Sequence, residues 1–252
     1  MVQPRKLEIA AASVPLCGPG DDCAILFART PIPGKVKSRL WTHLPPVLAC
    51  AFHCAAVSDT AALLAETLRD AALWVFFSEA PPTGTTGSGV VLPPGFRCTV
   101  QEGGDLGDRM AAAFARAFAA GAKRVVIFGS DSPTLPPAMI RRAFDTLADC
   151  DLVIGPTEDG GYYLIGCRGF DPQLFHGVEW STPRTCAQTL ANARRLGYRI
   201  APLERWFDLD EWKDVERLLA DARQGHPLPS HLAVFFKELD AAGELGRIVG
   251  NQ

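Results

Sequence analysis

The sequence predicts an α/β fold, a three-layer α/β/α sandwich around a mostly parallel sheet. Short apolar runs recur along the chain, each followed by a loop and then by a segment with helical spacing. The runs are continuously apolar, as in strands that are buried on both faces. Glycine pairs, cations and isolated aspartates come directly after them, at the edge where parallel sheets bind ligands.

Length and composition predict one domain, or one domain plus a small addition. The chain has 252 residues, of which 48% are hydrophobic, enough for a sizeable core. A formal net charge of −3 gives no general electrostatic reason to bind nucleic acid. The 8 cysteines are scattered without zinc-finger or Cys-x-x-Cys spacing, which favours a reducing, cytoplasmic location. The five tryptophans are compatible with a homodimer but do not predict one.

Three segments are expected: a flexible leader at 1–21, a nucleotide-binding transferase domain at 22–222 and a helical tail at 223–252. The apolar run in the leader is short and interrupted by Glu8, unlike a secretion signal. We expect no membrane insertion, because no apolar stretch approaches the roughly 20 residues that a membrane helix needs.

The first half of the domain alternates strands and helices. Helical spacing is clearest where Leu106, Met110, Phe114 and Phe118 follow one another at steps of four. A region rich in Gly, Thr and Pro at 81–94 has no periodicity and reads as a surface loop. The expected strands are 23–28, 73–77, 96–101 and 125–128, and the expected helices are 45–68 and 106–120.

The second half repeats the alternation, and helix caps mark its boundaries. Thr134 is expected to cap one helix, Ser181 or Thr182 the next, and Asp210 a third. The expected strands are 151–156, 162–166 and 199–203, and the expected helices are 135–148, 183–196, 211–221 and 232–245.

Asp131 is the first candidate for chemistry. It lies just past the most apolar run of the chain, after Gly129 and between Ser130 and Ser132. Its carboxylate could cap the following helix, or it could bind a divalent cation against a phosphate. Asp208 is a candidate second metal carboxylate, since Asp210 would already serve as the next helix cap.

The loop after the first strand is the candidate phosphate site. It carries four cations around a glycine, and Gly-Lys after a strand suits close approach of the backbone to phosphates. The loop is not a Walker A motif, because that motif needs another glycine and a Ser or Thr directly after the lysine. The alternative is a solvated basic loop. The candidate nucleotide- and phosphate-binding residues are Arg29, Gly34, Lys35, Lys37 and Arg39 of this loop, with Ser130 and Ser132 on either side of Asp131.

Gly103, Gly104 and Asp105 precede the helix that begins at Leu106. Asp105 is a good N-cap, with Asp108 as its capping-box partner, and this explains Asp105 on structural grounds alone. The glycine pair would additionally allow a ligand close to free amide groups at the helix start.

The segment from Glu158 to Gly161 has two interpretations. Asp-Gly between apolar runs indicates a β-hairpin. Alternatively, Asp159 or Glu158 lies at the end of the sheet, where a carboxylate could orient or deprotonate an acceptor hydroxyl beside Gly160 and Gly161.

Six motifs between about Cys23 and Asp221 resemble a bacterial group of predicted glycosyltransferases. The group is known as domain of unknown function 2064 or as radical-SAM/selenodomain-associated transferase 1. The resemblance implies a GT-A fold and, more distantly, similarity to the 2-phospho-lactate and molybdenum-cofactor guanylyltransferases. The motifs are Phe27-Ala28-Arg29, Pro33-Gly34-Lys35-Val36-Lys37-Ser38-Arg39-Leu40, Gly103-Gly104-Asp105-Leu106-Gly107-Asp108-Arg109-Met110, Gly129-Ser130-Asp131-Ser132-Pro133, Asp159-Gly160-Gly161-Tyr162-Tyr163 and Trp180-Ser181-Thr182.

The resemblance also implies roles for individual residues. The loop from Arg29 to Arg39 looks like the segment that holds base and phosphates. Asp131 looks like the metal carboxylate of the GT-A fold, although Ser-Asp-Ser stands here in place of Asp-x-Asp. Asp208 resembles the late acidic residue that completes the metal site of related nucleotidyltransferases. Mg²⁺ or Mn²⁺ is the implied cofactor. The implied acceptor-side residues are Glu158, Gly160, Gly161, Tyr162, Trp180, Ser181 and Thr182.

Three functions are therefore open. The leading hypothesis is a metal-dependent glycosyltransferase that moves a sugar from a nucleotide sugar to a small acceptor, with Lys35 and Asp159 as catalytic residues. The alternative is a nucleotidyltransferase that joins a nucleoside triphosphate to a phosphorylated small molecule and releases pyrophosphate. The third is a nucleotide-binding protein without turnover. The base, the sugar and the acceptor are not readable from the sequence.

Overall fold

The computed structural model describes residues 21–80 and 89–243. The expected leader therefore lies almost entirely outside the described residues, as does part of the expected loop at 81–94. A seven-stranded sheet with the strand order β3-β2-β1-β4-β6-β5-β7 forms the centre. The strands are β1 (Asp22–Ala28), β2 (Ala72–Phe77), β3 (Arg97–Val100), β4 (Arg124–Gly129), β5 (Leu152–Pro156), β6 (Tyr162–Cys167) and β7 (Ile200–Pro202).

The sheet is mostly parallel, as predicted. Only β6 runs against its neighbours β4 and β5, because β5 and β6 form the hairpin that the Asp-Gly signal indicated. The chain progresses outward from β1 to β3 and then returns to place β4 on the other side of β1. The carboxyl ends of β1 and β4 therefore meet at the point where the strand order reverses, which is where open α/β sheets bind ligands.

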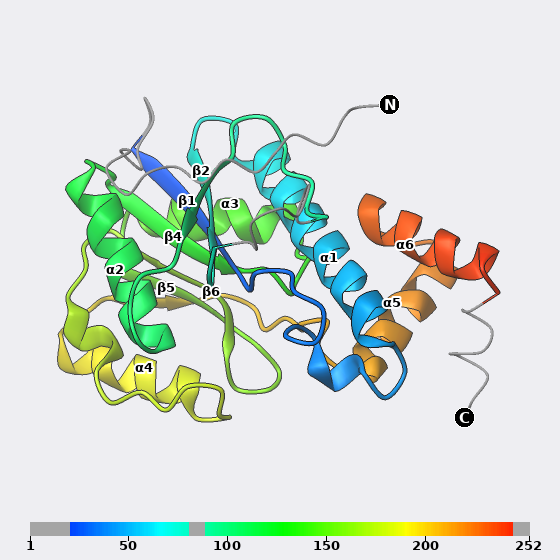
Figure 1. Ribbon diagram of the computed structural model, residues 1–252. Helices are drawn as coiled ribbons and strands as arrows, with labels where there is room; N and C mark the ends of the chain where they lie inside the picture. The colour runs from blue at the N-terminus through cyan, green and yellow to red at the C-terminus, as the bar shows by residue number, and fades with distance from the viewer. Residues whose placement is uncertain (1–20, 81–88, 244–252) are drawn as a thin grey trace.

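Helices cover both faces of the sheet and give the expected three layers (Figure 1). The helix α1 is one uninterrupted helix and packs with α3 on one face, while α2 and α4 cover the other. The helices are α1 (Pro46–Thr67), α2 (Leu106–Ala119), α3 (Pro137–Thr146), α4 (Thr185–Arg195), α5 (Trp212–Arg223) and α6 (Ser230–Ala241), with short 3-10 turns η1 (Ser38–Leu40) and η2 (Pro172–Phe175).

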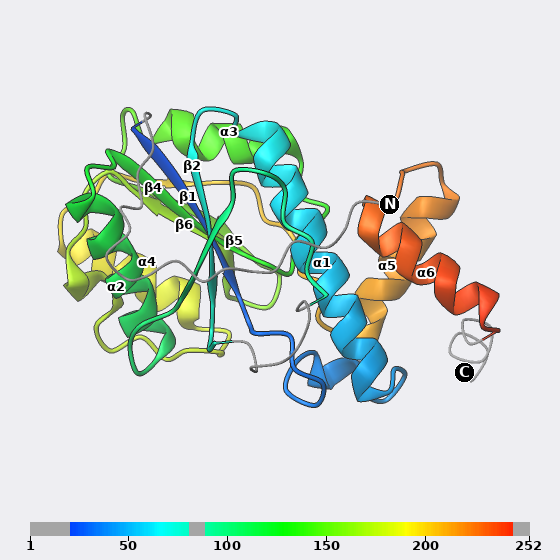
Figure 2. The same ribbon diagram turned by 45° about the horizontal axis from the view of Figure 1, so that its top comes forward.

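Alternation along the strands builds two cores. In β1, Ala24 and Leu26 face α1 and α3, whereas Ile25 and Phe27 face the side of α2 and α4. Both faces of the strand are thus buried, which accounts for its continuous apolar sequence. Figure 2 shows the two helical layers on either side of the sheet.

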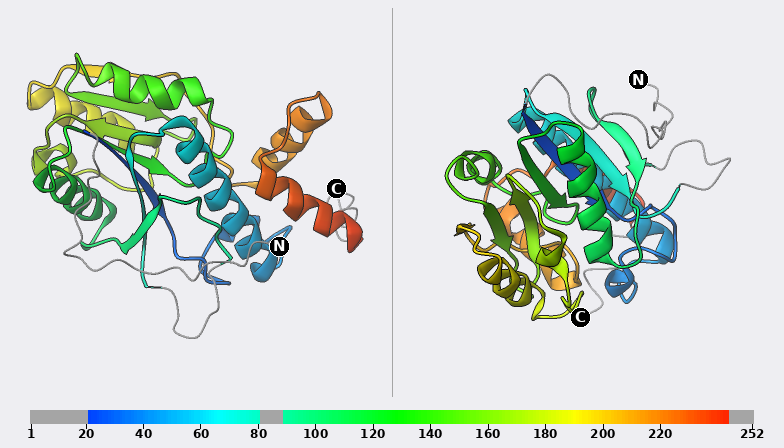
Figure 3. Two further views of the ribbon diagram at one scale, coloured as in Figure 1. Left: turned by 90° about the horizontal axis from the view of Figure 1, so that it is seen from above. Right: turned by 90° about the vertical axis from the view of Figure 1, so that its left-hand side faces the viewer.

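A third core joins the C-terminal helices to the start of α1. Leu40 and Phe52 pack there with Leu209 and with residues of α5 and α6. The carboxylate of Asp59, buried in the middle of α1, accepts hydrogen bonds from the backbone N–H groups of His231 (2.8 Å) and Leu232 (2.9 Å) at the start of α6. In Figure 3 the orange and red helices lie beyond α1, away from the sheet. Helix α6, the described part of the expected helical tail, is therefore held against α1 and against the loops that carry Leu40 and Leu209.

Three expectations about helix caps are wrong. Neither Ser181 nor Thr182 caps α4, which begins at Thr185 after Arg184; the Thr182 hydroxyl accepts instead from the backbone N–H of Arg184 (3.3 Å), before the helix. Thr134 does not cap α3, which begins at Pro137; its hydroxyl instead accepts a hydrogen bond from the Trp206 indole (3.3 Å). Asp210 does not cap α5, because Asp214 inside the first turn accepts from the backbone N–H of Glu211 (2.7 Å). The Asp210 carboxylate is thereby left for another partner.

The expectation about apolar stretches also needs correction. The helix α1, 22 residues long, is long and apolar enough to cross a membrane by length and composition. It contributes to the core under the sheet and to the third core, and 72% of its most apolar window is buried. Its apolar character is that of a core helix in this fold.

Candidate functional site

The carboxyl ends of β1 and β4 place several predicted residues together. Phe27 pairs with Gly129 in register, so Arg29 and Asp131 both follow directly from neighbouring strand ends. The backbone carbonyl of Asp131 accepts a hydrogen bond from the N–H of Leu209 (2.8 Å). This bond ties the segment from Asp208 to Asp210 against the end of β4, although 76 or more residues separate the two in the chain.

Lys37 lies at the centre of this cluster. Its ammonium lies 2.7 Å from Oδ1 of Asp131 and 2.8 Å from Oδ1 of Asp210, and it donates to the carbonyl of Leu209 at 2.8 Å. Three acceptors match the three N–H donors of a lysine ammonium. The side chain is only 4% exposed, so these contacts lie in a partly dehydrated environment.

Two features distinguish Lys37 from the other lysines of the loop. Its backbone adopts the left-handed conformation (φ 50°, ψ 43°), which non-glycine residues adopt rarely and at an energetic cost. Burial opposes the charge of its ammonium, but Asp131 and Asp210 outweigh burial and raise its pKa above the ordinary value. The lysine is therefore charged at neutral pH.

Asp131 and Asp208 differ in their electrostatics. Burial opposes ionisation of Asp131, but the Lys37 ammonium holds the pKa of this carboxyl below its usual range. Burial and then the Asp131 carboxylate raise the pKa of Asp208 to about 7. Ser132 donates a hydrogen bond from its hydroxyl to Oδ1 of Asp208. The cluster thus combines an ionised Asp131 with an Asp208 whose burial and charged neighbour favour the protonated form.

His53 is a buried neighbour of this cluster that the sequence interpretation did not single out. Its side chain is 2% exposed, and its Nε2 lies 2.9 Å from the carbonyl of Arg29. Nδ1 has no hydrogen-bond partner among the described residues. Burial lowers the pKa of the imidazole. A neutral His53 that donates from Nε2 to this carbonyl leaves Nδ1 as an acceptor, and the imidazole is close enough to Asp131 and Lys37 to feel their charges.

The other cations of the basic loop lie further out. Lys35 is exposed and pairs with Glu79 at 3.1 Å, so it contacts neither predicted metal aspartate. Arg39 is also exposed and lies 4.0 Å from Asp210 and 3.6 Å from Glu211. Gly34, with φ of 80°, forms the turn before Lys35 and has open space around it. The loop therefore divides into one buried lysine and an outer set of accessible cations.

The Gly103-Gly104 turn has the structure expected of a helix start. The backbone N–H of Asp108 donates to Oδ1 of Asp105 at 2.9 Å, which completes the expected capping box with α2. Gly103 has φ of 132°, and a Cβ there would come within 2.8 Å of the backbone of Arg109. The glycine is thus required by the turn itself, and phosphate binding at this helix start stays a prediction.

The hairpin carboxylate Asp159 is held by its own turn. Its Oδ1 accepts from the backbone N–H of Gly161 (3.0 Å) and from the Thr157 hydroxyl. Glu158 pairs instead with Arg217 of α5 at 3.2 Å. These contacts fix the orientation of the Asp159 carboxylate, while its role toward an acceptor stays a prediction.

Several predicted acceptor-side residues serve to join loops. A Cβ on Gly107 would come within 2.6 Å of the Trp180 ring, so the absence of a side chain lets that ring pack on α2. A Cβ on Gly160, whose φ is 91°, would come within 2.2 Å of the carbonyl of Pro183. The hairpin, the start of α2 and the Trp180 loop therefore form one packed unit. The remaining residues of this set are Tyr162, whose hydroxyl lies 3.8 Å from Sδ of Met110, Ser181, with φ of 59°, and Thr182, whose hydroxyl donates to the carbonyl of Glu179 at 3.1 Å.

The acidic cluster suits a divalent cation by the chemistry of its donors. Carboxylate and carbonyl oxygens of Asp131, Asp208, Leu209 and Asp210 are the hard ligands that Mg²⁺ and Mn²⁺ prefer. Among residues 21–80 and 89–243, no three acidic, histidine or cysteine side chains are arranged to hold a metal by themselves. Mg²⁺ usually takes one or two carboxylates and completes its coordination with substrate phosphates. The cluster fits that kind of site, in which the protein supplies part of the shell.

The sequence interpretation missed three members of this neighbourhood: Asp210, Glu79 and His53. Asp210 was assigned to a helix cap, and the strong alternative cap Asp214 four residues later was the signal that could have freed it. Glu79 lies two residues past the end of β2, at the same sheet edge as Arg29. Nothing in the local sequence of α1 distinguishes His53.

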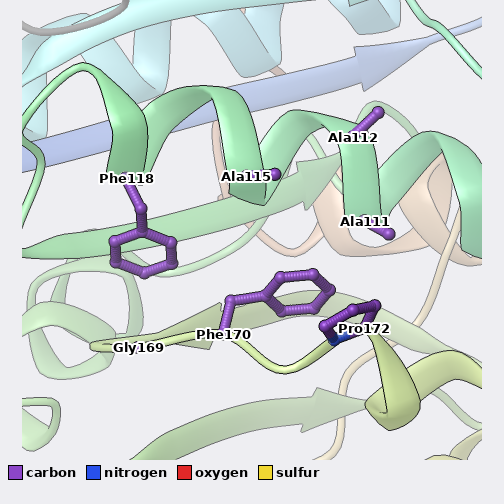
Figure 4. A pocket seen from close by; sticks show the side chains of 7 residues that line it. All are labelled: Ala111, Ala112, Ala115, Phe118, Gly169, Phe170 and Pro172. Atoms are coloured by element: carbon purple, nitrogen blue, oxygen red, sulfur yellow. The ribbon is translucent and has the colours of Figure 1, made fainter.

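A separate hollow of about 570 Å³ lies between α2 and the segment after β6 (Figure 4). It is lined by alanines and by Phe118, Phe170 and Pro172. Because β6 runs antiparallel, its end lies at the opposite edge of the sheet from Asp131. The hollow is therefore separate from the acidic cluster.

Known proteins resemble this chain to different degrees. The profile of a bacterial family described as "Uncharacterized protein conserved in bacteria (DUF2064)" matches residues 60–182. A proposed nucleotide-diphospho-sugar transferase from Desulfovibrio desulfuricans G20 is 31% identical, with a TM-score of 0.77 over 88% of this chain and 96% of that one. A cytidylyltransferase from Leptospira borgpetersenii is 12% identical, with a TM-score of 0.49 over 92% and 98% of the chains. No curated protein matches the chain.

Proposed function

The chain belongs to the DUF2064 family, and we propose that it is a transferase that moves a sugar from a nucleotide-activated donor to a small acceptor. The observation that carries the proposal is the position of Asp131. It lies at the reversal point of the sheet, in contact with Lys37 and next to Asp208. Ligand sites of open α/β sheets lie there, and clusters of perturbed carboxylates mark functional sites.

The proposed site has separate residues for the phosphates, the metal ion and the acceptor, as a diphosphate donor requires. Lys35 and Arg39 are exposed on the basic loop and would pair with phosphate oxygens. Mg²⁺ or Mn²⁺ held by Asp131 and Asp208 would neutralise charge on the leaving diphosphate. Asp159, with one carboxylate oxygen fixed by Gly161, would orient or deprotonate the acceptor hydroxyl.

The test is an analysis of products in the presence of Mn²⁺. A panel of UDP-, GDP- and dTDP-sugars is incubated with the protein and small hydroxyl acceptors, and release of free nucleoside diphosphate supports the proposal. Release of pyrophosphate from a nucleoside triphosphate would redirect the assignment to nucleotidyl transfer. Absence of both products with every donor would reject transfer.

Replacement of Asp131 then tests the site itself. Asp131→Ala removes a carboxylate at the position of developing charge, so kcat should fall by about 100-fold or more. Asp145→Ala is the matched control, because Asp145 is exposed on α3. Equal turnover in the two variants would remove Asp131 from the mechanism.

A further inference from the structure

The contacts of Lys37 resemble those of a bound cation. Its ammonium is surrounded by two carboxylate oxygens and one carbonyl oxygen at 2.7–2.8 Å. These oxygens come from the loop after β4 and from the segment before α5, which are far apart in the chain. The lysine reaches them from a left-handed backbone conformation at φ 50°, which the surrounding contacts must stabilise.

The same oxygens are the donors that a divalent cation would need. A metal bound to Asp131 or Asp210 would lie close to the position of the Lys37 ammonium, and two positive charges at such a distance repel strongly. Either the ammonium or a divalent cation can therefore occupy the space between these oxygens. The two cannot occupy it together. Because Lys37 is part of the chain, it competes at a high effective concentration.

A polyphosphate bound at the basic loop would give the Lys37 ammonium alternative anionic partners. Lys37 follows the open turn at Gly34 and lies between the exposed cations Lys35 and Arg39, where we place the donor phosphates. A polyphosphate there presents several anionic oxygens, which can replace the carboxylates as partners of the ammonium. Movement of Lys37 toward them would free Asp131 and Asp210.

We propose that Lys37 is a resident cation that competes with divalent metal for Asp131 and Asp210, so that metal binds well only together with a nucleotide polyphosphate. The metal half of this inference depends on the cluster alone, and the nucleotide half rests on the proposed function. The coupling is reciprocal: nucleotide raises the affinity for metal by the same factor as metal raises the affinity for nucleotide. Lys37 is in this sense a positioning residue.

The test measures Mn²⁺ binding without nucleotide, by electron paramagnetic resonance of free Mn²⁺. Lys37→Met keeps the stem of the side chain and removes the charge, so its affinity for Mn²⁺ should be at least about 10-fold higher than that of the wild type. Lys213→Met is the matched control, since Lys213 is a nearby exposed lysine that pairs with Glu211 at 2.7 Å. The control should bind Mn²⁺ as the wild type does. Adding Asp210→Asn to Lys37→Met should abolish the gain.

A second variant keeps the proposal testable if Lys37→Met folds poorly. Lys37→Gly relieves the left-handed conformation and opens the same position. Its melting temperature should rise with Mn²⁺ more than that of the wild type. If Lys37 only forms a structural ion pair, both variants should lose stability and neither should bind Mn²⁺ more tightly than the wild type. That result would overturn the proposal.

The nucleotide arm uses UDP, GDP, CDP and ADP. A nucleotide that binds the protein should raise the Mn²⁺ affinity of both proteins. The enhancement in the wild type should be at least about 10 times the enhancement in Lys37→Met. Equal enhancement in both proteins would overturn the coupling. If no nucleotide binds the wild type at all, the proposed function fails, while the comparison with Mn²⁺ alone still decides the competition.

Discussion

Replacing Asp208 with asparagine should stabilise the protein at alkaline pH, although it removes a predicted metal ligand. The pKa of the Asp208 carboxyl is raised from an ordinary value of 3.8 to about 7, chiefly by burial and then by the Asp131 carboxylate. Between these values the folded protein keeps a proton that the unfolded chain has lost. Stability should therefore fall as the pH rises through this window, and it stays low above it.

The magnitude follows from the size of the shift. A displacement of about three pKa units corresponds to about 4 kcal/mol, which is an upper value because the site can relax around the charge. Asparagine cannot ionise, and its amide oxygen can still accept the hydrogen bond that Ser132 donates. In the presence of a chelator, Asp208→Asn should exceed the wild type by up to about this amount at pH 8 and by little at pH 4.

The assay is urea unfolding of both proteins with EDTA at intervals between pH 4 and pH 8.5. Asp210→Asn is the contrasting variant: it removes a negative charge 2.8 Å from the Lys37 ammonium and should destabilise the protein at pH 8, where Asp208→Asn stabilises it. Identical pH slopes for Asp208→Asn and the wild type would refute the reasoning, as would a less stable Asp208→Asn at pH 8.

Two predictions concern the architecture that supports the site. Gly160→Ala should lower the free energy of unfolding by about 2 kcal/mol or more, because φ is 91° and a Cβ would approach the Pro183 carbonyl within 2.2 Å. Gly169→Ala is the control, since a Cβ there would have open space and should change stability little. Equal Tm values for the two variants would contradict this prediction. Asp59→Ala leaves the backbone N–H of His231 and Leu232 without their acceptor and should cost about 2 kcal/mol. Hydrogen exchange should then accelerate in α6 but not in the sheet, and unchanged protection there would contradict the capping role.

The layers of the fold were predictable because each strand carries its own signal. The runs that became β1, β4 and β5 are buried on both faces, so their composition is almost uniformly apolar. The antiparallel β6 was also predictable from the Asp-Gly turn at 159–160, as were the capping box at Asp105 and the spacing of apolar residues in α2. Each of these features depends on residues close together in the sequence, so it can be predicted without knowledge of the tertiary structure.

The partners within the site were less predictable, because they depend on contacts between distant segments. Sequence order does not reveal that Lys37, rather than Lys35, reaches Asp131, since the left-handed turn at Lys37 is not favoured by lysine itself. Asp210 could be freed from the cap only once Asp214 was known to take that role. The proximity of Asp131 and Asp208 was inferred from a family resemblance, and in the structure a hydrogen bond from Ser132 brings Asp208 to the end of β4.

The most direct test of the central claim is calorimetric titration of nucleoside diphosphates into the wild type and into Asp131→Ala, each in the presence of Mn²⁺. The account predicts that at least one nucleotide binds the wild type and that chelation of Mn²⁺ or loss of the Asp131 carboxylate weakens this binding by about 10-fold or more. Nucleotide binding of equal strength in both proteins, with and without Mn²⁺, would contradict it.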